Sequence, residues 1–267
     1  LDGRIKPDLV APGVMICSAR AEEAQFVEGD SCSSSEHADT DIPLYMTLNG
    51  SSMSTAVAAG ATTMARQFLR VNQGIVEPRS DLIRSVLING ADDLGAPDIP
   101  NAFEGWGQIN ISNSLFPEDS GDMLELLYDD SRELKPGHSF VYTIQSNADS
   151  RFDVTLVWND PEGSAVANQS SPKLLNDLDL KITSPSGIVY YGNNFVNGNS
   201  VTGGVEDSLN NVERFRLDSP EIGTWSVEVG HAGGSLQDYA IVMSGQIIES
   251  IFPDLTVFTN SLSTSVE

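Results

Sequence analysis

Residues 49–60 read Asn-Gly-Ser-Ser-Met-Ser-Thr-Ala-Val-Ala-Ala-Gly, a glycine–serine turn followed at once by small side chains. The turn predicts that Ser52 lies at the N-terminus of a helix, where backbone N–H groups favour a developing negative charge. The small side chains predict a helix that packs closely against its neighbours. Two interpretations fit: a nucleophilic serine presented by the turn, or an ordinary core helix with a serine cap.

This stretch resembles the Gly-Thr-Ser-Met-Ala-Thr-Pro signature of subtilisin-like serine proteases, the subtilases. Four positions match the signature: Gly50, Ser52, Met53 and Thr55. Three positions differ, with Ser51, Ser54 and Ala56 in place of the usual Thr, Ala and Pro. The missing proline changes how the first turn is held, although alanine favours a helix more strongly than proline does.

A second motif precedes the first. Residues 2–13, Asp-Gly-Arg-Ile-Lys-Pro-Asp-Leu-Val-Ala-Pro-Gly, resemble the strand and turn that come before the serine helix in subtilases. Residues 105–107, Gly-Trp-Gly, resemble the motif that closes the catalytic domain of this family. The resemblance implies that Ser52 is the acylation nucleophile of a hydrolase acting on peptide or protein substrates.

A serine nucleophile needs a base and a group that orients the base. In subtilases an Asp, a His and an oxyanion Asn precede the serine, and no stretch of this chain matches their motifs. The three histidines are His37, His138 and His231. We expect His37 to be an exposed loop residue rather than the base, and the other two to lie in turns. The family's partners are therefore expected upstream of Leu1, and the isolated chain is expected to be inactive.

The pattern of the chain changes near residue 121. Two helices are expected before it, over about 52–71 and over 80–89, with Ser80 as the N-cap of the second and Gly90 at its end. Short alternating runs follow it and predict strands over 140–144, 153–158, 178–183, 189–191, 214–217, 225–229 and 239–247. Strands at this spacing are typical of a β-sandwich or jelly roll.

We therefore expect an α/β region followed by an all-β domain. Residues 1–118 are expected to be the C-terminal part of a three-layer subtilisin-like domain, and residues 119–249 a β-sandwich or jelly roll. Residues 250–267 are expected to be a linker or the start of a further domain. The β domain resembles the one that follows the catalytic domain in some secreted bacterial alkaline subtilases, related in shape to the P-domain of proprotein convertases.

The chain carries 38 acidic against 14 basic residues, a net charge of −24. Nucleic acid is an improbable partner for such a chain, because binding to phosphates needs basic patches. No run of 18 apolar residues occurs, so no membrane span is expected. We expect a monomer that is secreted or held at the cell surface. The sequence leaves open whether Cys17 and Cys32 form a disulfide or remain free thiols.

Oxygen-bearing side chains recur in the β domain. Asp177 and Asp179 alternate along a predicted strand and so share one face. Hard oxygen ligands in number suit Ca²⁺. Nearby loops offer further oxygens, from Asp160, Asn193, Asn194, Asp207, Asn211 and Glu213. Of these, Asp160, Asn211 and Glu213 complete the expected ligand set with Asp177 and Asp179. The family resemblance likewise implies structural calcium in such a domain. The alternative is that these residues only form turns.

Two functions remain open from the sequence. The first is a secreted subtilisin-like serine endopeptidase, seen from its serine motif onward. The second is a non-catalytic scaffold in which the calcium-binding β domain acts as a binding or adhesion module.

Overall fold

The computed structural model of the protein describes residues 3–21, 23, 32, 44–95, 97–146, 150–163, 173–250 and 256–257. Contacts between residues divide the chain into two compact units. One unit is Val10–Ala61, and the other combines Leu1–Leu9 with Thr62–Glu267.

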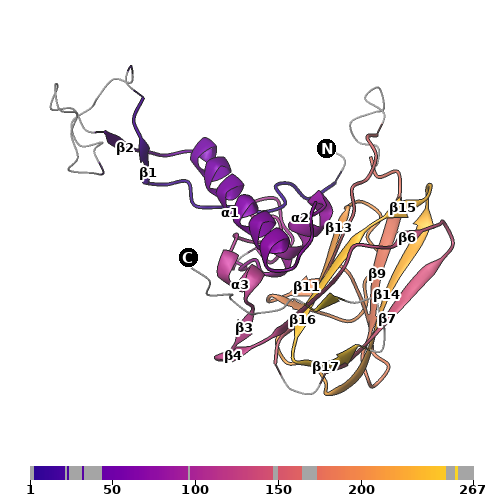
Figure 1. The fold of residues 1–267 in the computed structure, drawn as a ribbon. Coiled ribbons are helices and arrows are strands. Elements are labelled where there is room, and N and C mark those ends of the chain that lie inside the picture. The colour runs from indigo at the N-terminus through magenta and orange to yellow at the C-terminus, as the bar shows by residue number, and fades with distance from the viewer. Residues whose placement is uncertain are drawn as a thin grey trace. The chain divides into compact units, whose positions relative to one another are not determined.

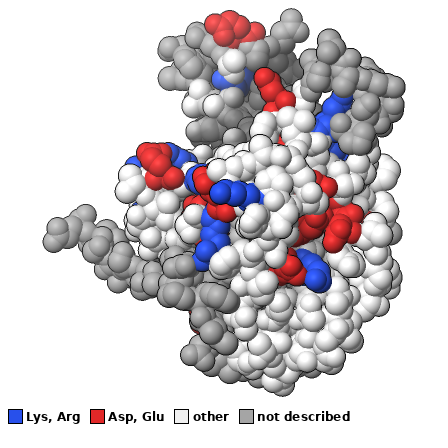
Figure 2. Space-filling model, turned by 90° about the vertical axis from the view of Figure 1, so that its right-hand side faces the viewer, with Lys and Arg blue, Asp and Glu red and all other residues white. Residues whose placement is uncertain are grey.

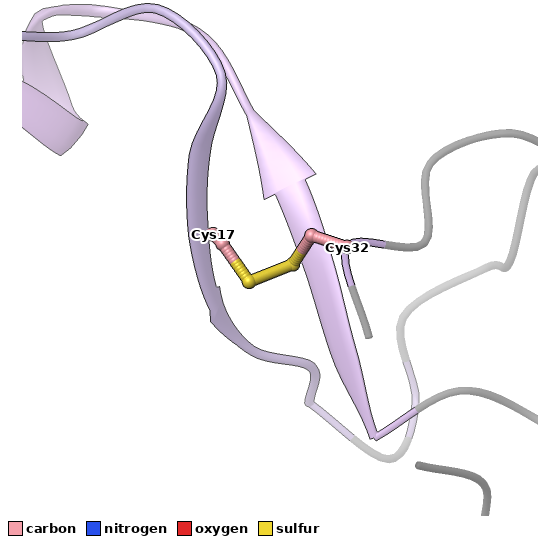
Figure 3. Close-up of a disulfide and its surroundings, with 2 residues drawn as sticks. All are labelled: Cys17 and Cys32. Atoms are coloured by element: carbon pink, nitrogen blue, oxygen red, sulfur yellow. A yellow bond between two sulfur atoms is a disulfide. The ribbon is translucent and has the colours of Figure 1, made fainter. Parts of the chain in front are cut away.

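The Val10–Ala61 unit contains an antiparallel hairpin. Strand β1 (Ile16–Ala19) pairs with β2 (Tyr45–Leu48), with Ile16 opposite Leu48 and Ala19 opposite Tyr45. A disulfide joins Cys17 of β1 to Cys32, with their Cα atoms 5.8 Å apart (Figure 3). The pairing that the sequence left open is therefore formed in the structure.

Three helices are described. Helix α1 (Ser51–Val71) begins one residue before its predicted start and buries Ala65, Phe68 and Leu69 near its end. Helix α2 (Ser80–Asn89) has the predicted bounds, but its N-cap is Arg79, and the Ser80 hydroxyl accepts a hydrogen bond from Asn159 Nδ2. Helix α3 (Ile111–Leu115) was not predicted.

Gly90 ends α2 as expected, but for a different reason. Its φ of −91° is open to any residue, so no left-handed cap demands glycine here. A Cβ at this position would instead lie 2.4 Å from the backbone N and Cα of Ser114 in α3. Glycine is needed because α2 and α3 approach each other closely.

Two five-stranded antiparallel sheets form the rest of the structure (Figure 1). The first has the order β13-β8-β16-β5-β18, built from Val212–Leu217, Phe152–Val157, Ala240–Gly245, Glu125–Asp129 and Thr256–Val257. The second has the order β10-β9-β14-β7-β17, built from Val189–Tyr191, Asp177–Thr183, Gly223–Gly233, Ser139–Ser146 and Ile247–Ser250. We call residues 125–250 the two-sheet region.

One hydrophobic core contains side chains from both sheets. Trp225 and Val227 of β14 share it with Phe152 of β8, Phe215 of β13 and Met243 of β16. The outer face of the first sheet is covered by helices, because α2 packs against β8 and β16. Side chains of α1, α2 and α3 share a second core with Leu126, Tyr128, Ala240 and Val242 of that sheet. These strands are therefore buried on both faces.

Three short antiparallel pairs complete the strands. They are β3 (Glu118–Asp119) with β4 (Asp122–Met123), β6 (Glu133–Leu134) with β15 (Gln237–Asp238), and β11 (Phe195–Val196) with β12 (Asn199–Ser200). The part of the chain that the structure describes is thus mostly β-sheet with three helices. The three-layer α/β arrangement of residues 1–118, the jelly-roll assignment and the domain boundaries stay predictions. No helix within the described ranges is long and apolar enough to cross a bilayer.

Candidate active site and acidic cluster

Ser52 is the second residue of α1 and is exposed. The turn before it is held by two contacts across the unit: Gly50 N–H donates to Gly13 O at 2.7 Å, and Met15 N–H donates to Asn49 Oδ1 at 2.5 Å. Gly50 has a φ of +147°, in the region that favours glycine. The turn therefore presents the Ser52 side chain at a helix N-terminus, as the sequence predicts.

The two motifs that resemble subtilases meet at Gly13. A Cβ on Gly13 would lie 2.1 Å from Ser54 Oγ and 2.8 Å from Gly50 O. Gly13 and the serine turn are thus in close contact, and any side chain at residue 13 would push the helix start away. The second motif, through Gly13, supports the turn that carries Ser52.

The histidines do not complete a catalytic group in the described structure. His37 lies outside the described residues. His138 is exposed, and its Nδ1 lies 3.2 Å from Pro136 O. His231 is buried within strand β14 rather than in a turn, with Nε2 2.7 Å from Ser235 O and Nδ1 3.2 Å from Asp177 O. His138 and His231 thus have contacts of their own in the two-sheet region.

The Gly-Trp-Gly segment is a tightly packed turn. Gly105 has a φ of +65°, and a Cβ on it would lie 2.1 Å from Pro7 O. Trp106 is 1% exposed, and its N–H donates to Asp8 O at 2.9 Å. The indole Nε1 of Trp106 donates to Asn193 Oδ1 in the two-sheet region at 2.9 Å. Trp106 therefore anchors residues 3–9 and the two-sheet region to the same point.

The predicted calcium ligands fall into two groups. Asp160 accepts hydrogen bonds from Leu175 N–H and Asn176 N–H, and Asn211 Nδ2 donates to Trp158 O. These two residues hold loops in place. In contrast, Asp177 Oδ1, Asp179 Oδ1 and Glu213 Oε1 are buried atoms without a hydrogen-bond partner in the described structure.

The carboxyls of Asp177, Asp179 and Glu213 act on one another and interact with Glu206 and Asp207, while Asp160 acts on Asp177 alone. Burial first, and then the carboxylates of Asp177, Glu206 and Asp207, together raise the pKa of Asp179 to about 7. Burial also raises the pKa of Glu213 well above its usual range, with Asp207, Asp179 and Asp177 adding to the effect. We call Asp177, Asp179, Glu206, Asp207 and Glu213 the acidic cluster.

In the described structure, positive charge acts on Asp177 through His231 and on Glu206 through Lys181, while acidic neighbours dominate the charges that act on Asp179 and Glu213. Glu213 is fully buried, and Leu180 N–H donates to its Oε2 at 2.8 Å, while its Oε1 has no partner. Gly192 has no room for a side chain, since a Cβ there would lie 2.3 Å from Glu213 Oε2. A bound cation would supply the missing charge. As the side chains lie, however, no three His, Cys, Asp or Glu within the described ranges are grouped closely enough to hold a metal ion.

Sequence reasoning missed Glu206, and it noted Asp207 as a source of oxygens without placing it in the expected ligand set. Asp207 lies in a loop before β13, and its Oδ1 accepts from Leu209 N–H and Asn210 N–H. Such an Asx turn looks in the sequence like any loop aspartate. Only the fold brings this loop beside β9 and β13, so the sequence could mark Asp207 as an oxygen source but could not place it next to Asp177 and Glu213.

On the face of the molecule drawn in Figure 2, Lys and Arg side chains lie beside Asp and Glu side chains, so charges of opposite sign are mixed on this surface. Ion pairs of this kind join Arg84 and Lys6 to Asp8, and Arg79 to Asp238 at 2.7 Å. Pairing of this kind neutralises basic side chains locally. The predictions on nucleic acid and on the monomeric state are not tested by this arrangement.

Comparison with protein families matches residues 1–107 to the model of the subtilase family, Peptidase_S8. A "Serine protease/ABC transporter B family protein tagA" of Dictyostelium discoideum is 30% identical over 247 residues, which cover 85% of this chain and 14% of that protein. The related protein tagD is 29% identical and covers 79% of the chain and again 14% of its own length. "Serine protease AprX" of Bacillus subtilis (strain 168) is 33% identical over 113 residues, 42% of the chain and 22% of the relative.

The chain thus spans about one seventh of the Dictyostelium relatives. A match to a solved structure, the Bacillus licheniformis lipase BlEst2 in propeptide form, has 11% identity and a TM-score of 0.28 over 49% of the chain and 24% of the lipase. The homology therefore rests on sequence: residues 1–107 are related to subtilases and so to serine proteases of that family.

Proposed function

We propose that this chain is the serine-bearing part of a subtilisin-like serine endopeptidase, followed by an accessory β-sandwich. The observation that supports this most is the serine turn. Ser52 is exposed at the start of α1, in the signature that resembles the family's, and Gly13 of the second motif holds that turn. Both motifs lie inside the residues that match the subtilase family.

In the proposed reaction Ser52 Oγ attacks the carbonyl carbon of the scissile peptide bond. Its proton passes to a histidine base and from there to the leaving amine, and water then hydrolyses the acyl-enzyme. The backbone N–H of Ser52, at the helix N-terminus, is expected to donate to the oxyanion. The Asp, His and oxyanion Asn would come from residues outside this chain, so the 267 residues alone should be inactive.

A fluorophosphonate probe tests this proposal. Expressed together with the polypeptide that precedes Leu1, the chain should be labelled at Ser52, and Ser52→Ala should abolish labelling. Ser54→Ala is the matched control, because it changes a serine in the same turn to the residue that the family signature carries. Labelling of Ser54→Ala but not of Ser52→Ala supports the proposal. If the protein is folded but the fluorophosphonate probe does not label it, the result would favour the interpretation as a non-catalytic scaffold.

We propose further that the two-sheet region binds structural calcium. Asp177, Asp179 and Glu213 would supply ligands, since each has a buried carboxylate oxygen without a partner. Carboxylates that repel one another are expected to lie apart without a cation and to close around it, which is how we account for the open grouping. When bound, calcium would offset this negative charge and stabilise the folded state by mass action.

Thermal unfolding with and without calcium tests this second proposal. Removing calcium with a chelator should lower the melting temperature, and Asp179→Asn should remove most of that difference. Asp218→Asn is the control, because Asp218 pairs with Arg216 and Asn199 and is not part of the acidic cluster. An equal calcium effect in wild type and Asp179→Asn would contradict the assignment.

The Cys17–Cys32 disulfide supports a protein that works outside the cell, secreted or at the cell surface, because disulfides persist in oxidising compartments. Alkylation before and after reduction provides the test. In protein taken from the native host, Cys17 and Cys32 should react only after reduction. Two cysteines that are freely alkylated in the native protein would argue for a reducing compartment.

A further inference from the structure

A cavity with a volume of about 320 Å³ opens in the unit that combines Leu1–Leu9 with Thr62–Glu267, and none of its lining residues belongs to the acidic cluster. Its walls come from residues 3–9, from helix α2 and from the segments around Asp160 and Lys173. Small-molecule sites occupy about 300–1,000 Å³, and this cavity lies at the lower end of that range. Its size therefore suits a small ligand.

Basic side chains are concentrated in this cavity. Four of the 14 basic residues of the chain line it: Arg4, Lys6, Arg84 and Lys173. Three acids line it as well, so the cavity is formally positive in a chain whose net charge is −24. A cavity of this sign favours an anion, which most of the remaining surface would repel.

The acids of the cavity do not neutralise its cations one by one. Asp8 accepts from Lys6 Nζ, and Arg84 Nη2 donates to Asp8 Oδ2 at 3.0 Å, so one carboxylate serves two cations. Asp160 accepts from two backbone N–H groups at 2.9 and 2.8 Å, which hold its carboxylate in the protein. The third acid, Glu162, is exposed. Positive charge therefore stays in excess beside Asp8.

Arg84 has donors to spare for a ligand. Its side chain is 27% exposed, and the bond to Asp8 is the one hydrogen bond that the described part of the chain gives its guanidinium. A guanidinium carries five N–H groups in a rigid plane that matches a carboxylate or a phosphate. Lys6 is 50% exposed and adds an ammonium beside the same carboxylate. Arg84 can thus bind an anion while it stays anchored to Asp8.

The walls of the cavity are held in place by protein contacts. Ile5 N–H donates to Asn210 Oδ1 at 2.7 Å, which fixes the segment that carries Lys6. At the start of α2, the helix that carries Arg84, Asn159 Nδ2 donates to a serine hydroxyl at 2.9 Å. Because binding groups that are already ordered lose little freedom, such walls favour binding of a small ligand.

We propose that this cavity binds a small organic anion, whose carboxylate or phosphate group is held by Arg84 and Lys6. Pro161 and Leu174 also line the cavity and would contact the carbon skeleton of the ligand. A few placed polar groups beside apolar side chains are typical of small-molecule sites. The site shares no residue with the proposed nucleophile or with the acidic cluster, so it depends on neither proposal above.

NMR titrations of the whole 267-residue chain test this proposal. Butyrate and inorganic phosphate are the probes, added at constant ionic strength because salt screens exposed charges. The backbone amides of Gly163 and Leu174, in the cavity wall, are the reporters. We expect at least one of the two anions to shift them with saturation, and butylammonium, a cation with the carbon skeleton of butyrate, to leave them unchanged. Saturation by butyrate alone would assign the ligand to carboxylic acids, and saturation by phosphate alone to phosphate esters.

Charge-removing variants show whether the named side chains hold the anion. Arg84→Gln should weaken binding by about tenfold or more, the loss expected for one hydrogen bond to a charged group. Lys6→Gln should also weaken binding, and it serves as the test if Arg84→Gln folds poorly, since Lys6 is the more exposed of the two. Arg66→Gln is the matched control, because Arg66 pairs with Glu77 at 2.9 Å and does not line the cavity.

Two results would overturn the inference. One is binding of equal strength in wild type, Arg84→Gln and Lys6→Gln. The other is a wild-type chain in which neither anion gives a saturable shift up to about 50 mM, well above a millimolar dissociation constant. Labelling of Ser52 and the effect of calcium on unfolding are measured separately, so the three proposals can fail independently.

Discussion

Within Val10–Ala61, none of the residues that the structure describes is buried, whereas the two-sheet region and its neighbours bury 19 side chains in one core. Apolar side chains such as Val14 and Met15 are 73% and 70% exposed in the smaller unit. Trp158, Phe215 and Trp225 are fully buried in the larger one. The candidate nucleophile therefore lies in the part of the chain with the least buried apolar surface.

This contrast has a physical consequence. Burying one large apolar side chain stabilises a fold by about 1.5–3 kcal/mol. The two-sheet region therefore has a large source of stability that is missing from the described part of Val10–Ala61. The smaller unit depends instead on local links: the β1–β2 hairpin, the Cys17–Cys32 disulfide and the contact of Gly13 with Gly50. We expect its amides to exchange through local opening well before the chain unfolds globally.

The largest effect should come from the buried charge of the larger unit. Arg214 is fully buried and donates to Asp153 Oδ1 at 3.1 Å and to the backbone oxygens of Asn89 and Trp106. Burial lowers the pKa of Arg214 to about 10, with Asp153 opposing the shift. Arg214→Met should destabilise the two-sheet region by about 3–5 kcal/mol in urea unfolding, because it leaves buried acceptors and a buried carboxylate undercompensated.

Lys181→Met is the control for that measurement. Lys181 and Glu228 form a 2.9 Å ion pair whose side chains are 38% and 29% exposed, and such pairs contribute at most about 1 kcal/mol. If the two variants cost the same, the buried Arg214–Asp153 pair does not hold the larger unit together. Amide exchange in the β1–β2 hairpin should be the same in both variants, because the hydrogen bonds described for Arg214 all lie within the larger unit.

A second prediction addresses the smaller unit. The disulfide spans 15 residues, a loop for which cross-linking stabilises by about 3 kcal/mol in the chain-entropy model. Cys17→Ser with Cys32→Ser should therefore speed amide exchange in β1 and β2 strongly. The urea midpoint of the two-sheet region should hardly move. A joint loss of stability in both regions would show that the two units unfold as one.

Local sequence signals predicted the regular elements well. Helix α2 and strand β10 were predicted at their observed bounds, and β8, β9 and β13 to within one or two residues. These elements have strong periodicity or apolar runs. The predicted strand over 239–247 was wrong in one respect: Ala240–Gly245 and Ile247–Ser250 are separate strands in different sheets. A change of sheet at Gln246 depends on long-range pairing, which no local pattern reveals.

The candidate sites show the same limit. Ser52 could be predicted because glycine, serine and small residues stand together in the sequence. Three of the five predicted calcium ligands carry buried oxygens without a partner in the described structure, but Asp160 and Asn211 hold loops. Asp207 was noted as an oxygen source but not placed in the expected ligand set. Spacing shows which oxygens share a strand face. It cannot show which loop the fold brings beside that strand.

Glycine-to-alanine substitutions extend the comparison to smaller effects. Gly90→Ala would bring a Cβ within 2.4 Å of the Ser114 backbone, where no side chain can yield. We expect it to push α2 and α3 apart and to destabilise the larger unit by about 1–3 kcal/mol. Urea unfolding measures this cost. A variant as stable as wild type would mean that the contact between α2 and α3 relaxes easily.

Gly60→Ala is the counterpart in Val10–Ala61 and should have the opposite sign. Gly60 lies inside helix α1, and an added Cβ would meet nothing within 4 Å. Alanine in a helix interior is favoured over glycine by about 1 kcal/mol, so this variant should slow exchange of the α1 amides by roughly fivefold. A destabilised Gly60→Ala would mean that something packs closely on this part of the helix. In that case the openness of the smaller unit would not be a property of the working protein.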